Sequence, residues 1–245
     1  MGDFFELYDA LIDNIDDGGE RISSAYCGSR WSAAEYPGHL GMAMFTPGES
    51  MPAEYPEGPE GLTVRAAAET VKSWNFREAG MGLAACNAYF NSSERMEKLN
   101  AYEPYENYST AGLDMEGRTV GLIGHLHLPE RDVRKVKEIH IIERDPQLGD
   151  YPDSACDWIL PRCDLVLITG STIVNKTLPH LLELCRNACT ILTGPSVPMC
   201  PALLDFGIDR LAGLIVDDFD SMRSHIKAGK RGNPYFMGQS FLLKK

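Results

Sequence analysis

The sequence predicts an α/β protein: a parallel, Rossmann-like sheet forms the C-terminal half, and a smaller α+β region precedes it. From Arg118 onward, short β-branched runs alternate with helical patterns, and parallel neighbours require such crossover connections. Three of these runs also finish in glycine beside polar residues. Ligands of open α/β sheets bind at the carboxyl ends of the strands, so a ligand site is expected there. The three runs cover residues 118–123, 164–169 and 188–193, and they lead into Gly124, Gly170 and Gly194.

The front region begins with an amphipathic pattern. Apolar side chains recur at helical spacing over residues 3–16, with aspartates between them, and Gly18-Gly19 follows. Residues 20–28 and 39–45 are expected to form antiparallel strands. A loop containing Trp31 is predicted to separate them.

The remaining front elements are predicted from composition. Residues 47–61 are rich in proline and glycine, which indicates an irregular surface excursion. Helical patterns follow over residues 64–73 and 76–90. The polar, tyrosine-rich stretch 100–111 is expected to hold the domain junction. We therefore predict two domains, covering residues 1–108 and 109–245.

The C-terminal half continues the alternation to the end of the chain. The last residues mix charge with aromatic side chains and are expected to fold back on the body as a tail. Besides the three runs above, we predict helix 130–137, strand 139–143, helix 153–160, helix 177–186, strand 212–216, helix 218–228 and the tail 229–245.

Composition limits the classes of function. The net charge of -12 repels phosphate backbones and anionic membranes, so nucleic acid and membrane partners are not expected. No secretory signal and no apolar run long enough to span a bilayer is visible. Seven cysteines without a compact framework favour reduced thiols, mostly in the core. We therefore expect a cytoplasmic protein, with a homodimer as the ordinary oligomeric expectation.

Two segments combine glycine with hydroxyl side chains at strand ends. They are Gly170-Ser171-Thr172 and Gly194-Pro195-Ser196. Backbone amides at such turns carry partial positive charge and suit a carboxylate, a phosphate or another anion. Asn175 and Thr177 follow; they either orient the ligand or cap the next helix, and Lys176 between them is predicted to be solvated.

A second set of candidates surrounds the first strand of the alternation. Gly124 and His125 stand where a dinucleotide-binding fold has its phosphate loop, and Glu143 ends the next strand, where an acid meets a ribose hydroxyl. The glycine fingerprint is incomplete, so Gly124 also fits a plain tight turn. His125 and His127 are candidate metal ligands. Asn87, on an apolar helical pattern, is either hydrogen-bonded internally or aimed at the interdomain cleft.

Taken together, the C-terminal motifs resemble the putative heavy-metal chelation family. The resemblance extends over most of residues 112–230 and implies a Rossmann-like domain joined to a front domain similar to the amino-terminal domain of enolases. The motifs that carry it are Ile141–Pro146, Gly149–Pro152, Leu160–Asp164, Ile168–Thr172, Val174–Leu178, Gly194–Ser196 with Pro198, and Leu211–Gly213.

The resemblance implies a site between the two domains and a link to metals or to metal-chelating small molecules. Our leading hypothesis is a protein that binds an anionic or metal-chelating ligand in this cleft. The sequence does not identify a resident cofactor, and the candidate is a metal ion or a metal chelate. One alternative is a transferase-like enzyme that uses a nucleotide or S-adenosylmethionine-type cofactor, with His125 as general acid or base. Another is a scaffold protein whose glycine turns are purely structural.

Overall fold

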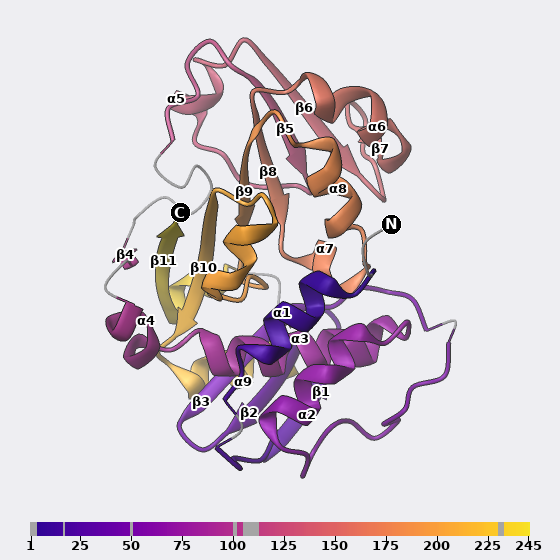
Figure 1. Ribbon diagram of the computed structural model, residues 1–245, viewed down its shortest axis with the longest axis vertical. Coiled ribbons are helices and arrows are strands. Elements are labelled where there is room, and N and C mark those ends of the chain that lie inside the picture. The colour runs from indigo at the N-terminus through magenta and orange to yellow at the C-terminus, as the bar shows by residue number, and fades with distance from the viewer. Residues whose placement is uncertain (1–3, 17, 50, 100–101, 105–112, 230–232) are drawn as a thin grey trace.

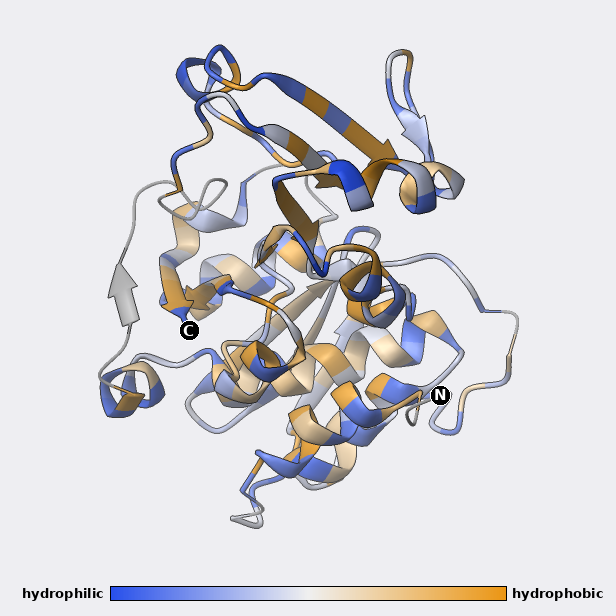
Figure 2. Cartoon of the chain, turned by 45° about the horizontal axis from the view of Figure 1, so that its top comes forward, coloured by the Kyte–Doolittle hydropathy of each residue, from blue (hydrophilic) through white to orange (hydrophobic). Residues whose placement is uncertain are grey.

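The chain folds into two β-sheets with helices packed around them (Figure 1). The computed structural model describes residues 4–16, 18–49, 51–99, 102–104, 113–229 and 233–245. In Figure 2 the strands of the larger sheet are mainly hydrophobic, whereas the outer helices carry more polar residues. Both predictions of fold class are confirmed: a mostly parallel sheet dominates the C-terminal half, and a small antiparallel sheet with helices forms the front.

The front sheet contains strands β1 (Ser24–Cys27), β2 (Trp31–Tyr36) and β3 (His39–Met44), in that order and antiparallel. The prediction of a loop around Trp31 was wrong, because residues 31–36 form the central strand. Every residue of β2 is buried, so its sequence lacks the alternation of apolar and polar side chains that is typical of a half-exposed strand.

Helix α3 (Phe76–Phe90) packs against β2 and β3 and ends where the prediction placed it. Its packing depends on Gly41 in β3, since a Cβ there would lie 2.1 Å from the Ala84 carbonyl oxygen. The side chain of Asn75 accepts a hydrogen bond from the Glu78 amide and caps the start of α3. This close contact of strand and helix lies at the centre of the front lobe, which is the part of the molecule formed by the described residues up to Leu99.

The other front helices are shorter than predicted. Helix α1 (Glu6–Asp13) lies inside the predicted range 3–16, and α2 (Val64–Glu69) continues into the 3₁₀ turn Thr70–Lys72. Helix α4 (Ser93–Leu99) was not predicted. The described part of residues 47–61 contains no helix or strand, as expected. The predicted junction 100–111 lies outside the described residues, apart from a short strand at 102–104.

The larger sheet has the order β4-β11-β10-β9-β8-β5-β6-β7 within the described residues. The strands from β7 to β10 are parallel, and in chain order they follow the 3-2-1-4-5-6 arrangement of doubly wound folds. Successive strands are therefore added on one side of β5 up to β7 and on its other side from β8 onward, so the strand order reverses between β5 and β8. The strands are β4 (Tyr102–Pro104), β5 (Thr119–Ile123), β6 (Glu138–Glu143), β7 (Tyr151–Pro152), β8 (Leu165–Thr169), β9 (Cys189–Thr193), β10 (Arg210–Val216) and β11 (Gly238–Lys244).

The predicted crossover helices are present but short. The tail folds back as expected and adds a strand that was not predicted, β11, antiparallel to β10. No helix in the described ranges combines the length and apolar character needed to cross a membrane. The helical segments are α5 (Glu130–Val133), α6 (Cys156–Ile159) between 3₁₀ turns at Asp153–Ala155 and Leu160–Arg162, α7 (Ser171–Val174), α8 (Leu178–Leu184), α9 (Phe219–Lys227), and 3₁₀ turns at Pro201–Phe206 and Pro234–Met237.

The front lobe and the lobe that contains the larger sheet share an apolar core. Buried hydrogen bonds also join these two lobes. The Tyr8 hydroxyl on α1 donates to the Ile173 carbonyl on α7 at 3.0 Å. Asn91, which ends α3, donates from Nδ2 to the Val197 and Leu214 carbonyls and accepts from the Met199 amide. These bonds fix the front lobe over the carboxyl ends of the parallel strands.

Candidate functional site

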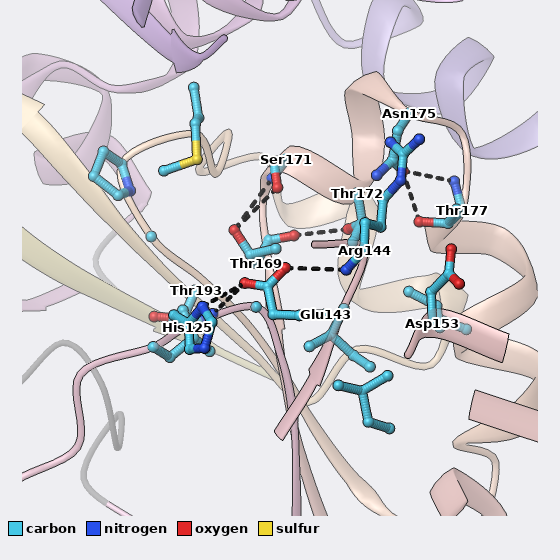
Figure 3. Close-up of a pocket in the computed structure, with 18 of the residues that line it drawn as sticks. His125, Glu143, Arg144, Asp153, Thr169, Ser171, Thr172, Asn175, Thr177 and Thr193 are labelled. Carbon is cyan, nitrogen blue, oxygen red and sulfur yellow. Dashed lines mark hydrogen bonds and ion pairs between the residues drawn. The ribbon is translucent and has the colours of Figure 1, made fainter. Parts of the chain in front are cut away.

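A pocket of about 780 Å³ lies at the carboxyl ends of strands β5, β6, β8 and β9, beside the point where the strand order reverses (Figure 3). This volume is typical of sites for drug-sized ligands. Its wall is mostly apolar and includes Ile123, Leu126, Ile142 and Leu181. The front lobe contributes Arg30, Trp31 and Met44, and the tail contributes Asn233, Pro234 and Tyr235.

Two arginines supply positive charge to this wall. Arg30 comes from the turn before β2, and Arg144 directly follows β6. Both are exposed, and neither forms an ion pair or side-chain hydrogen bond with any other described residue. An unpaired guanidinium in a mostly apolar pocket is suited to a carboxylate or phosphate group. The sequence predicted neither residue.

His125 is held between two carboxylates. Its amide donates to Glu143 Oε1 at 2.8 Å, and its ring nitrogens lie 3.1 Å from Glu143 Oε1 and 2.8 Å from Asp150 Oδ2. Glu143 also accepts from the Arg144 amide, and Figure 3 shows this line of contacts from the imidazole to the backbone of Arg144. These contacts of Glu143 and Asp150 hold the turns that follow β5 and β6 in place. They leave neither ring nitrogen of His125 directed at a ligand.

The polar side chains after β8 are partly committed to one another. Thr172 donates to the Thr169 carbonyl at 2.7 Å, and the Thr169 and Ser171 hydroxyls lie 3.3 Å apart. Asn175 accepts through Oδ1 from the amide and the hydroxyl of Thr177. The capping alternative is therefore confirmed only in part. Asn175 orders the turn before α8, but the Thr177 side chain does not cap that helix. No described group accepts from the side-chain Nδ2 of Asn175, so this donor is available to a ligand.

The glycines at the strand ends serve two purposes. Gly124 has φ +98°, where a side chain would be strained and where a Cβ would lie 3.1 Å from Thr169. Gly194 has φ +119°. Gly170, by contrast, has an ordinary helical backbone, and a Cβ there would lie 2.8 Å from the Ser196 carbonyl carbon. Gly170 therefore permits close packing of two turns behind the pocket.

The structure brings most of the predicted site residues to this one pocket. Three of them lie elsewhere. Asn87 is buried and donates to the Met42 carbonyl at 2.7 Å, which matches the internal alternative for that residue. Gly170 and Ser196 are buried behind the wall. The predicted residues that line the pocket are Gly124, His125, Glu143, Ser171, Thr172, Asn175, Thr177, Gly194 and Pro195.

Ser196 connects the two lobes. Its hydroxyl accepts from the Met44 amide at 2.8 Å and is almost fully buried. We expect Ser196→Ala to lower the free energy of unfolding by about 1–2 kcal/mol, because the amide loses its acceptor. Chemical denaturation checks this value, with Ser171→Ala as the matched control, since the Ser171 hydroxyl is hydrogen-bonded, among the described residues, only to the Thr169 hydroxyl. Equal stability of the two variants would contradict this role.

The prediction that Lys176 is solvated was wrong. The side chain is buried between α1, α3 and the turn that joins α7 to α8, and Nζ donates to the Val174 carbonyl at 2.8 Å. Lys176 has φ +65°, the one positive φ at a non-glycine position within the described residues. Residues on both sides of it, Asn175 and Thr177, line the pocket.

The side chains of the pocket do not form a binding site for a bare heavy-metal ion. Within the described residues, no group of three or more His, Cys, Asp or Glu side chains is arranged to hold a metal. Both ring nitrogens of His125 face carboxylates, so His125 is engaged in the strand-end turns rather than free to share a metal with His127, the other candidate ligand. Burial raises the pKa of the Cys156 thiol in the wall to about 11, so without a metal this thiol is protonated at neutral pH.

The fold and the site place the chain among doubly wound α/β proteins with a pocket at the strand switch point. The comparisons then identify the family. Two family models, both described as putative heavy-metal chelation, match residues 111–242 and 8–90. The chain belongs to the putative heavy-metal chelation family.

Solved structures agree with this assignment. The chain is 34% identical to a protein of unknown function from Desulfitobacterium hafniense, with a TM-score of 0.87 over 99% of this chain and 98% of that one. A protein of unknown function from Pyrococcus horikoshii has the same fold at 21% identity, with a TM-score of 0.80 and 99% of both chains covered. An uncharacterized protein from Methanocaldococcus jannaschii is 29% identical over 163 residues, which span 63% of this chain but only 61% of that relative.

Proposed function

We propose that this protein binds an anionic, metal-chelating small molecule in the pocket between its two lobes. The observation that carries the proposal is the presence of two arginines, Arg30 and Arg144, that pair with no other described residue in a mostly apolar pocket of about 780 Å³. An apolar pocket with a few convergent polar groups is the usual form of a small-molecule site. Metal chelators commonly bear carboxylates, and guanidinium groups bind carboxylates through paired hydrogen bonds.

The ligand, rather than the protein, supplies most of the metal-binding atoms in this proposal. The family description refers to heavy-metal chelation, whereas no three-donor group is present in the described part of the chain. A chelator that already surrounds its metal needs only charge recognition and shape from the protein. Arg30 and Arg144 provide the charge, Asn175 Nδ2 provides a hydrogen-bond donor, and Trp31 and Met44 cover the apolar body.

A nucleotide or S-adenosylmethionine-type cofactor is the second candidate, and the strand order favours it. The 3-2-1-4-5-6 sheet has its pocket at the switch point, where dinucleotides bind in doubly wound folds. Two features favour the anionic, metal-chelating small molecule instead. The Glu143 carboxylate already accepts three hydrogen bonds or ion-pair contacts from His125 and Arg144, and the short α5 helix after β5 begins only at Glu130.

A ligand panel tests the proposal and separates the candidates. Isothermal titration calorimetry is run with citrate, nitrilotriacetate, their zinc complexes, zinc chloride, NAD and S-adenosylmethionine. We expect the chelators or their zinc complexes to saturate one site per chain, while zinc chloride alone gives no stoichiometric binding. The physical reason is that the pocket presents cationic groups to the ligand and lacks a coordination set.

Two outcomes would contradict the proposal. One is failure of every member of the panel with the fold intact by circular dichroism; the other is stoichiometric binding of zinc that is tighter than that of any chelate. Native mass spectrometry of the purified protein supplies an independent result. A co-purified nicotinamide or adenosyl compound, lost in Gly124→Val, would establish the cofactor-dependent enzyme instead.

A further inference from the structure

Lys176 is enclosed on the far side of the turn that forms one wall of the pocket. Its ammonium nitrogen lies 5.6 Å from the centroid of the Tyr8 ring on α1 and 5.8 Å from that of the Phe76 ring on α3. Its hydrogen bond goes to the Val174 carbonyl on α7. The residue is 5% exposed, and its side chain does not line the pocket, although Asn175 and Thr177 do.

No carboxylate compensates the charge of Lys176 within salt-bridge distance among the described residues. The groups that face the ammonium are one carbonyl and two aromatic rings; of these only the Tyr8 phenol titrates, and burial raises its pKa further above its ordinary value. Burial lowers the pKa of Lys176 to about 7, while the carbonyl and the ring faces favour the charged form. Burying a lysine without an acid partner lowers the stability of the fold, and a left-handed backbone at a residue other than glycine lowers it further.

We propose that Lys176 is a positioning residue of the ligand pocket, which fixes Asn175 and Thr177 in the wall and adds a positive charge behind them that depends on its proton. This proposal rests on the function proposed above for its ligand-binding consequence. The positioning part follows from two contacts: the side chain anchors the turn against α1 and α3, and the Tyr8 hydroxyl anchors the same segment through Ile173. The charge part follows from the enclosure of the ammonium between two rings, with no carboxylate of the described residues within salt-bridge distance.

The charge couples ligand binding to pH. An anion in the pocket stabilises the buried protonated amine across the turn of Asn175 and Thr177, so binding raises the pKa of Lys176 from about 7 in the ligand-free protein. Because the bound state then holds more protons than the free state, the affinity for an anion falls as the pH rises above about 7. Each unit by which binding raises the pKa corresponds to about a tenfold loss of affinity across that window.

The experiment compares the wild-type chain with Lys176→Met and Lys176→Gly, using citrate as the probe. Met keeps the apolar stem without a charge, and Gly suits the left-handed backbone without a side chain. Calorimetry between about pH 7 and pH 9, in buffers of different ionisation enthalpy, measures affinity and proton uptake together. We expect the wild type to take up protons and lose affinity with rising pH, and Lys176→Met to bind more weakly at pH 7 with no slope. All pocket histidines are kept in both chains, so the difference belongs to Lys176.

Lys176→Gly tests the positioning part without any ligand. The Thr177 amide is hydrogen-bonded to Asn175 and to the Thr172 carbonyl, and we expect its hydrogen exchange to be at least about tenfold faster in this variant. Unchanged exchange, or a wild-type pH slope in Lys176→Met, would overturn the proposal. If the wild type binds no citrate at any pH, the proposed function fails for this probe, and the exchange result alone decides the role of Lys176.

Discussion

Replacing Asn91 by leucine is expected to lower the free energy of unfolding by about 3–5 kcal/mol, because the change leaves three buried backbone groups without partners. Asn91 donates to the Val197 carbonyl at 2.9 Å and to the Leu214 carbonyl at 3.1 Å, and it accepts from the Met199 amide at 2.9 Å. Leucine has a similar volume but neither donor nor acceptor. Since these bonds join α3 of the front lobe to the larger sheet, the loss affects the framework of the pocket as well as the global stability.

Urea denaturation monitored by circular dichroism measures this change. Asn14→Ala is the control, since Asn14 is exposed and its side-chain Nδ2 donates, among the described residues, only to the Ala10 carbonyl of α1. The control is expected to change stability by less than about 0.5 kcal/mol. A comparable loss in both variants would show that Asn91 contributes no more than an ordinary surface amide.

The double variant Arg30→Gln with Arg144→Gln is expected to reduce citrate affinity by at least about 100-fold, on the basis of about 1.5–3 kcal/mol for each hydrogen-bonded charge contact. The chain carries a net charge of -12, so its overall field opposes an anionic ligand. After the double change, the remaining charged groups in the wall include Glu143, Asp153 and Asp157. Neither arginine pairs with another described residue, so the thermal midpoint should stay unchanged.

Calorimetry with citrate and differential scanning calorimetry measure the two quantities. Arg131→Gln is the control, because it removes the same charge from an exposed side chain on α5 outside the pocket wall. The control is expected to keep the wild-type affinity within about twofold, the size of a screened long-range effect. Wild-type affinity in the double variant would remove the main support for an anionic ligand.

The local pattern of the chain predicted most of the elements. Strand 164–169 shows a continuous apolar, β-branched run and residues 76–90 show a helical pattern, and the structure has them as β8 and α3. Strand β2 escaped prediction because both of its faces are covered, so Ser32 and Glu35 sit in the interior without an alternating pattern. Helix α3 and helix α9 supply that cover, and neither is adjacent to β2 in the sequence.

The same distinction applies to the site. Glycine turns after Ile123, Thr169 and Thr193 were visible in the sequence, since strand ends and turn residues are encoded by neighbours. Arg30 was not visible because nothing near it in the chain indicates that the front lobe covers these turns. Arg144 carried a usable signal, since it directly follows Glu143 at the end of a predicted strand.

The sequence by itself determined the fold class, the parallel strands and the turns at which a ligand site was expected, because each follows from the pattern of an element and of its immediate neighbours in the chain. Only the tertiary structure decided which of these side chains face the pocket. It buried Ser196 behind the wall, engaged His125 between two carboxylates, and enclosed Lys176 between two rings. The physical reason is that burial and pairing are properties of surfaces that meet from distant parts of the chain, and no local pattern specifies that meeting.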